Sequence, residues 1–121
     1  MSDNSSMVDQ RRSVRFAVDL QCEVASDAWQ GTVPLRLTNL SLDGAFVETD
    51  LPLHIGSELV LVFNPDGEHD LRILAEVRRV ELRRRRAEST APRGMAVSFA
   101  YVGRGDRASL QRWLTARTTD S

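Results

Sequence analysis

The sequence predicts one domain dominated by β-structure, a barrel or a sandwich of short strands followed by a C-terminal helix. Three observations predict it. Six segments have strand-like patterns, turn signals containing Gly or Pro separate them, and only the last part of the chain has helical spacing. At 121 residues, the chain can bury one hydrophobic core without disulfides or a metal to crosslink it.

The first two strands show the clearest alternation. From Phe16 to Ala25 every even-numbered side chain is apolar, and this period of two predicts a half-buried strand. A second strand is expected over Thr32–Leu40, where every second side chain from Val33 to Leu37 is apolar. Pro34 cannot donate to a strand ladder, so it predicts an edge or bulge position.

Later segments complete the fold. Four more strands are expected at Ala45–Thr49, Glu58–Phe63, Leu71–Val80 and Met95–Tyr101. The last segment has helical spacing instead, because Leu110, Trp113 and Leu114 fall on one face. Asp106 is expected to cap this helix, which should close one opening of a barrel.

The two ends of the chain indicate the domain boundaries, and the cysteine content indicates the cellular compartment. Residues 1–10 are polar without a sustained apolar period, so we expect a flexible N-terminal tail. One domain is expected over residues 11–117, with a short C-terminal tail over 118–121. Cys22 is alone and no signal-peptide pattern stands at the N-terminus, which favours a cytoplasmic protein without membrane insertion.

The composition and the net charge exclude some classes of function. Hydrophobic residues make up 41% and charged residues 27%, as in ordinary globular proteins, and the net charge of -1 argues against binding to nucleic acid or lipid through the overall field. All 16 basic residues are Arg. They form two clusters, one at Arg11, Arg12 and Arg15 and the other at Arg83–Arg86.

The first Arg cluster lies between the polar tail and the first strand. Arg11, Arg12 and Arg15 fall within five positions. A guanidinium group is a planar, permanently charged fork that pairs with phosphate and stacks on flat rings. The alternative is a solvated cluster that prevents association at the strand edge, and taken alone the cluster favours that alternative.

A polar segment, Asn39-Leu40-Ser41-Leu42-Asp43-Gly44, joins two strands. Asn39 and Ser41 have the same side-chain parity, so on an extended chain both would face one way as a paired polar edge. Gly44 allows a positive φ and a close approach of the backbone to a ligand. The alternative is an Asx or Ser turn, which by itself is the simpler interpretation of the segment.

Together, Arg11-x-x-x-Arg15 and Asn39-x-Ser41-x-x-Gly44 resemble the two-part signature of PilZ domains, which are receptors for the bacterial second messenger cyclic di-GMP. Both motifs are complete, and the gap between them fits a strand, a turn and a strand. The resemblance covers residues 10 to 115. It implies an antiparallel, six-stranded PilZ-type β-barrel with a C-terminal α-helix.

The resemblance also implies the ligand site. Cyclic di-GMP carries two phosphates, which suit cationic forks, and two guanines whose O6 and N7 atoms both accept hydrogen bonds. Asp is common in the family where Asn39 stands, and the amide keeps an acceptor but loses the negative charge. The implied ligand-binding residues are Arg11, Arg12, Arg15, Asn39, Ser41 and Gly44.

Other reactive residues have simpler interpretations. Neither His54 nor His69 has a Cys, His or carboxylate grouping at metal-ligand spacing, so no metal site is expected. Cys22 alternates with apolar neighbours as a small buried hydrophobe. Arg83–Arg86 is expected to be a solvated strand end. The sequence has no pair of nucleophile and base and no Gly-rich phosphate loop, so neither catalysis nor a cofactor is expected.

These observations predict a non-enzymatic receptor that relays cyclic di-GMP to a downstream protein, in motility or surface behaviour as the family suggests. Ligand binding would order the tail up to Arg15 and create a surface for that partner. The alternative is a PilZ-like interaction adaptor that binds no nucleotide. No DNA or RNA is expected, because two Trp, one Tyr and four Phe supply no exposed aromatic ladder. We expect a monomer or a weak dimer.

Overall fold

The computed structural model describes residues 15–82 and 93–120, with side chains described through Arg117. The expected N-terminal tail, Arg11 and Arg12 of the first cluster and the whole Arg83–Arg86 cluster therefore lie outside the described residues. Helix α2 continues to Asp120, beyond the expected domain boundary at residue 117.

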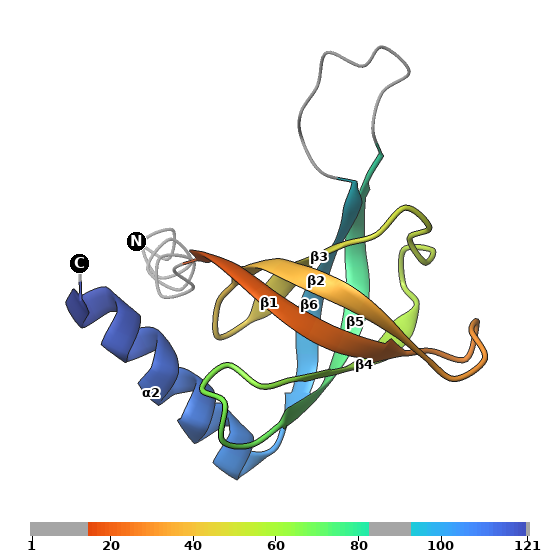
Figure 1. The fold of residues 1–121 in the computed structure, drawn as a ribbon. Coiled ribbons are helices and arrows are strands. Elements are labelled where there is room, and N and C mark those ends of the chain that lie inside the picture. Colours follow the sequence, from red (N-terminus) through yellow and green to blue (C-terminus); the bar gives the residue numbers. More distant parts are fainter. Residues whose placement is uncertain (1–14, 83–92, 121) are drawn as a thin grey trace, which may run out of the picture.

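Six antiparallel strands close into a barrel in the order β1-β2-β3-β6-β5-β4 (Figure 1). A barrel therefore forms, and not a sandwich. The expected and observed strand bounds agree to within one residue at each end. The strands are β1 Phe16–Ala25, β2 Thr32–Leu40, β3 Gly44–Glu48, β4 Glu58–Phe63, β5 Leu71–Glu81 and β6 Gly94–Val102.

The alternating pattern of the strands builds the core. Apolar side chains of odd number on β4 and β5, such as Leu61 and Ile73, are fully buried, while their even-numbered neighbours face outward. Cys22 is 2% exposed within this core, as its alternation predicted. Burial in an apolar environment raises the pKa of the Cys22 thiol to about 12.

The pairing of β1 is unequal on its two sides. On one side, β1 pairs with β2 along most of its length, from Phe16 opposite Leu40 to Ala25 opposite Thr32. On the other side, it pairs with β4 only from Cys22 onward. Among the described strands, the first half of β1 thus has one neighbour. Pro34 lies in the half of β2 that pairs with β1 alone, in agreement with its expected edge position.

Helix α2, Arg104–Asp120, lies at one end of the barrel (Figure 1). Leu110 and Leu114 are buried in the core cluster, and Trp113 packs against it, so the expected apolar face is confirmed. Because buried side chains of α2 complete the core at this end, the helix closes the barrel there. No helix in the described part of the chain combines the length and the apolar character needed to cross a bilayer.

The expected cap of α2 was wrong. The helix begins at Arg104, two residues before Asp106, and the Gly103 carbonyl accepts its first helical hydrogen bond from Arg107 N–H at 2.8 Å. The Asp106 carboxylate instead accepts a hydrogen bond from the backbone N–H of Arg72 on β5, at 3.1 Å. Asp106 therefore joins the helix to the barrel, an interaction that local spacing does not reveal.

Candidate functional site

The two sequence motifs meet where β1 begins and β2 ends. Arg15 is exposed and immediately precedes Phe16, whose partner across the ladder is Leu40. One position further along β1, Ala17 lies opposite Asn39. Residues that are more than twenty positions apart in the sequence are thereby brought side by side. The antiparallel register places the last Arg of the first motif next to the start of the second motif.

Asn39 occupies an irregular part of the sheet. Its ladder partners are Ala17 on β1 and Phe46 on β3, and the register shifts next to it in both pairings. Irregularities of this kind bend a strand and change the direction of its side chains. The Asn39 side chain is partly exposed. It is therefore accessible from the surface beside Arg15.

Ser41 does not form the expected polar edge with Asn39. The strand alternation ends at Leu40, and Ser41 is only 1% exposed. Its Oγ accepts hydrogen bonds from the backbone N–H groups of Asp43 and Gly44, both at 3.1 Å. The hydroxyl also donates to the Gly44 carbonyl at 3.3 Å. The Ser turn that the sequence offered as the alternative is the one that forms, and the hydroxyl holds its backbone.

Gly44 lies very close to a neighbouring strand. Its φ is not positive, and the glycines with positive φ in the described residues are Gly31, Gly56 and Gly67. A Cβ on Gly44 would instead overlap the carbonyl oxygen of Val97 on β6. The close approach that excludes a side chain is to the neighbouring strand. Gly44 therefore lets the turn lie tightly against the barrel wall.

The C-terminal part of α2 also reaches this region, which the sequence analysis missed. Arg117 Nη2 donates to the Ala17 carbonyl at 3.4 Å. The same guanidinium carbon lies 4.7 Å from the centroid of the Trp113 ring, one helical turn earlier. The spacing of four between Trp113 and Arg117 could have suggested this stacking. Nothing in the local sequence indicates that the pair ends beside β1.

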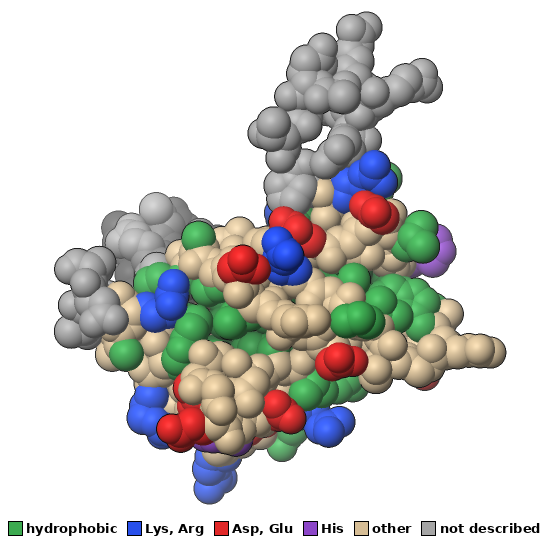
Figure 2. All heavy atoms as spheres, viewed as in Figure 1, with side chains coloured by type: hydrophobic (Ala, Val, Ile, Leu, Met, Phe, Trp, Pro, Cys, Tyr) green, Lys and Arg blue, Asp and Glu red, His purple; other side chains and the backbone are tan. Residues whose placement is uncertain are grey.

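A hollow lies further along the outer face of β1 and β2. It has a volume of about 420 Å³ and includes both partners of the Arg36–Asp19 ion pair, whose atoms are 3.3 Å apart. Acidic and basic side chains are interspersed with apolar ones on the face shown in Figure 2. The residues that line the hollow are Asp19, Gln21, Pro34, Leu35 and Arg36.

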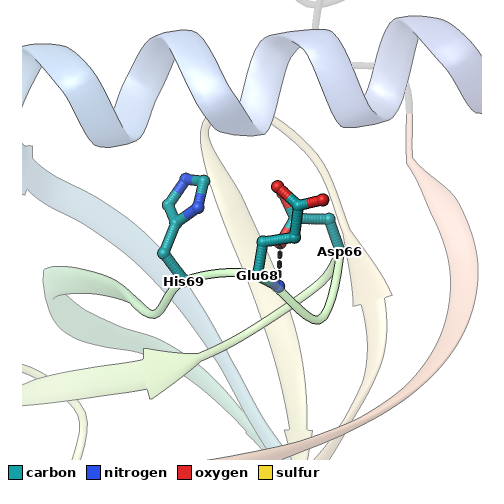
Figure 3. A group of neighbouring side chains, drawn as sticks. All are labelled: Asp66, Glu68 and His69. Carbon is teal, nitrogen blue, oxygen red and sulfur yellow. Dashed lines mark hydrogen bonds between the residues drawn. The ribbon is translucent and has the colours of Figure 1, made fainter.

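The β4–β5 loop contains a grouping that the sequence analysis did not find. Potential ligand atoms of Asp66, Glu68 and His69 all lie within 4.8 Å of one another. Glu68 and His69 point toward α2, while the Asp66 carboxylate turns back to the loop (Figure 3). All three are exposed. The expectation that His69 had no carboxylate nearby was therefore wrong, because the loop folds back on itself.

Local hydrogen bonds account for this grouping. The Asp66 carboxylate accepts from the backbone N–H of Glu68 at 2.9 Å, and this bond holds the pKa of Asp66 below its usual value. His69 Nε2 lies 3.2 Å from the Ser109 hydroxyl of α2. The loop geometry thus serves to attach the loop to the helix, and we assign no ligand to it.

Known proteins resemble this chain in sequence pattern and in fold. The PilZ domain family model matches residues 9–116. No curated protein matches the sequence significantly. Among solved structures, the PilZ domain with c-di-GMP of YcgR from Escherichia coli is similar, with a TM-score of 0.69, 20% identity and coverage of 92% of this chain and 93% of that one.

Two further structures are similar. The Bacillus subtilis inhibitor of motility MotI/DgrA has a TM-score of 0.75 and 22% identity, with 92% of this chain covered. This chain spans about half of that protein, 52% of its length. The PilZ domain of CeSA from a cellulose-synthesizing bacterium has a TM-score of 0.62 and 20% identity, with 88% and 99% covered. At these identities the solved structures show a common fold.

Proposed function

This chain belongs to the PilZ domain family, and from that premise we propose that it is a receptor for cyclic di-GMP that relays occupancy of its site to a partner protein. The observation that supports the proposal is the register of β1 and β2, which pairs Ala17, two residues after Arg15, with Asn39 just before the turn. Both halves of the family signature are complete in the sequence. We propose that a single ligand contacts both.

The proposed ligand chemistry follows from the residue types. Arg11 and Arg15 are the principal ligands, through phosphate oxygens and the acceptor edge of guanine, and Arg12 assists them. The Asn39 amide, partly exposed beside Arg15, contacts the other guanine. These assignments extend the family pattern to the matching positions of this chain.

Ser41 and Gly44 have an indirect role in this proposal. The Ser41 hydroxyl is buried and hydrogen bonded within the turn, and Gly44 packs against β6. Both therefore fix the backbone that presents Asn39. The direct contact of Ser41 and Gly44 with the ligand, which the family pattern implies, stays a prediction beside this supporting role.

The similar structures support the ligand and the biological context. One of them is described as a PilZ domain with c-di-GMP and another as an inhibitor of motility. We propose a corresponding role in motility or surface behaviour, in the cytoplasm and without catalysis.

Calorimetric titration with cyclic di-GMP tests the receptor proposal. We expect saturable binding by the parent protein and a loss of about tenfold or more in affinity for Arg15→Ala, because hydrogen bonds to charged groups are worth that much. Arg79→Ala is the matched control, since Arg79 is exposed on β5 and paired with Glu81. It should bind as the parent does.

Two outcomes would contradict the proposal. If folded parent protein gives no binding at millimolar ligand, the chain is an adaptor that acts through protein contacts. If Arg15→Ala and Arg79→Ala weaken binding equally, Arg15 is not a ligand and the site lies elsewhere. Circular dichroism of each variant establishes that the barrel is intact in both cases.

A further inference from the structure

We propose that Arg117 of α2 is an additional ligand-contacting residue, which binds a phosphate of the cyclic dinucleotide, and that Trp113 is the residue that positions it. This inference rests on the proposed function. It adds to the two-motif site a contact from the C-terminal helix, an element outside both motifs.

The position of Arg117 follows from the unequal pairing of β1. Because β4 joins β1 only from Cys22 onward, α2 can lie along the other side of the first half of β1. There, Arg117 Nη2 is 3.4 Å from the Ala17 carbonyl. Ala17 and Asn39 are direct partners, and the Cα atoms of such a pair are about 5 Å apart. The guanidinium thus lies near the proposed ligand site.

The Trp113 ring holds the orientation of the Arg117 guanidinium. The Trp113 ring lies against the core, and the guanidinium stacks over it at 4.7 Å. Stacking of this kind restricts the plane of the guanidinium and stabilises its charge. The C-terminal end of a helix also favours a cation. The side chain is therefore preorganised, so less conformational entropy is lost when a ligand binds.

The present acceptor of Arg117 is weaker than a phosphate. Its hydrogen bond to a neutral carbonyl is long and uses one of the five N–H donors of the guanidinium. A phosphate oxygen accepts shorter, charge-assisted bonds from the same fork. Arg15 is exposed and lies immediately before β1. A phosphate bound there would have one cationic group from the residue before β1 and one from α2.

Titration of two Arg variants with cyclic di-GMP tests the inference. We expect Arg117→Gln to weaken binding about tenfold, and Arg117→Lys to weaken it less, because Lys keeps the charge and loses the fork. Arg112→Gln is the matched control, since Arg112 is exposed on the same helix and donates to Ser109. It should change the affinity less than about twofold.

Two more readouts separate ligand contact from a structural role. Raising the ionic strength should weaken parent binding more than it weakens the remaining binding of Arg117→Gln, because a charged contact is screened by salt. If Trp113 acts through Arg117, the substitution Trp113→Leu should weaken binding when it is made in the parent protein. It should have little further effect when it is made in the Arg117→Gln variant. Thermal unfolding of each variant reports on helix attachment independently.

The outcomes distinguish this inference from the proposed function. If the parent binds cyclic di-GMP and Arg117→Gln binds it as tightly as Arg112→Gln does, the inference is wrong and the receptor proposal stands. If Arg117→Gln lowers affinity only together with the unfolding temperature, and with unchanged salt dependence, Arg117 is a structural tether. If the folded parent does not bind the ligand, both proposals fail.

Discussion

Gly44 lies so close to Val97 across the β3–β6 ladder that a Cβ would overlap the Val97 carbonyl oxygen. The turn between β2 and β3 is thereby pressed against the barrel wall. A backbone hydrogen bond of 2.8 Å from Phe99 N–H to the Asp43 carbonyl holds the same contact. The packing of Asp43 and Gly44 against β6 therefore helps to fix the turn that follows Asn39.

Gly44→Ala should destabilise the protein by about 1–3 kcal/mol, because backbone atoms cannot yield as a flexible side chain can. Urea unfolding measures the change. Gly105→Ala is the control, since a Cβ on that helical glycine meets nothing within 4 Å. It should be neutral or stabilise α2 by up to about 1 kcal/mol. Equal stability of Gly44→Ala and parent would contradict the close approach.

Ser41→Ala should reduce the free energy of unfolding by about 1–3 kcal/mol, because the buried N–H of Gly44 would lose its acceptor. Ser26→Ala provides the comparison, since Ser26 Oγ accepts a similar bond from Ala28 N–H at 3.1 Å in an exposed turn. There, water replaces the lost acceptor and the change should stay within about 0.5 kcal/mol. Similar losses in chemical denaturation of the two variants would refute the supporting role of Ser41.

Asp106→Ala should destabilise the protein by about 1–2 kcal/mol, because its carboxylate connects the first turn of α2 to the backbone of Arg72. Asp19→Ala should cost less than about 0.5 kcal/mol, since both partners of its ion pair with Arg36 are more than half exposed, at 61% and 78%. Thermal unfolding of the two variants makes the comparison. A larger effect at Asp19 would be inconsistent with this account.

The Cys22 thiol should make stability fall in alkaline solution. Its pKa is 9.0 when unperturbed and about 12 in the folded barrel, so the folded state retains a proton that the unfolded state loses. The stabilisation is complete below pH 9 and is lost progressively from there toward pH 12. Between pH 8 and pH 10 the loss should be about 1 kcal/mol.

Urea titrations at both pH values measure this loss, with Cys22→Ala as the control that removes the thiol. The difference in stability between parent and variant should shrink as the pH rises. At neutral pH, native protein should also react with a thiol reagent only after unfolding. A parent and a variant with the same pH dependence would show that the thiol does not contribute.

Much of the fold could be predicted because its signals are local. Alternation set the bounds of β1, and apolar spacing identified Leu110 and Leu114 on the buried face of α2. The site was predictable only in part. Ser41 is the clearest case. The alternation of side chains along a strand predicted an exposed Ser41 hydroxyl, but the strand ends at Leu40 and the hydroxyl is buried.

The sequence by itself determined which segments form strands, which side chains are buried and which two motifs stand at the start of β1 and the end of β2. These properties follow from the period of side chains along one segment. Only the tertiary structure decided that Gly44 contacts β6, that Asp106 reaches β5 and that Arg117 lies beside Ala17. Such contacts depend on strand register and on helix packing between residues far apart in the chain, and no local pattern encodes the distance between them.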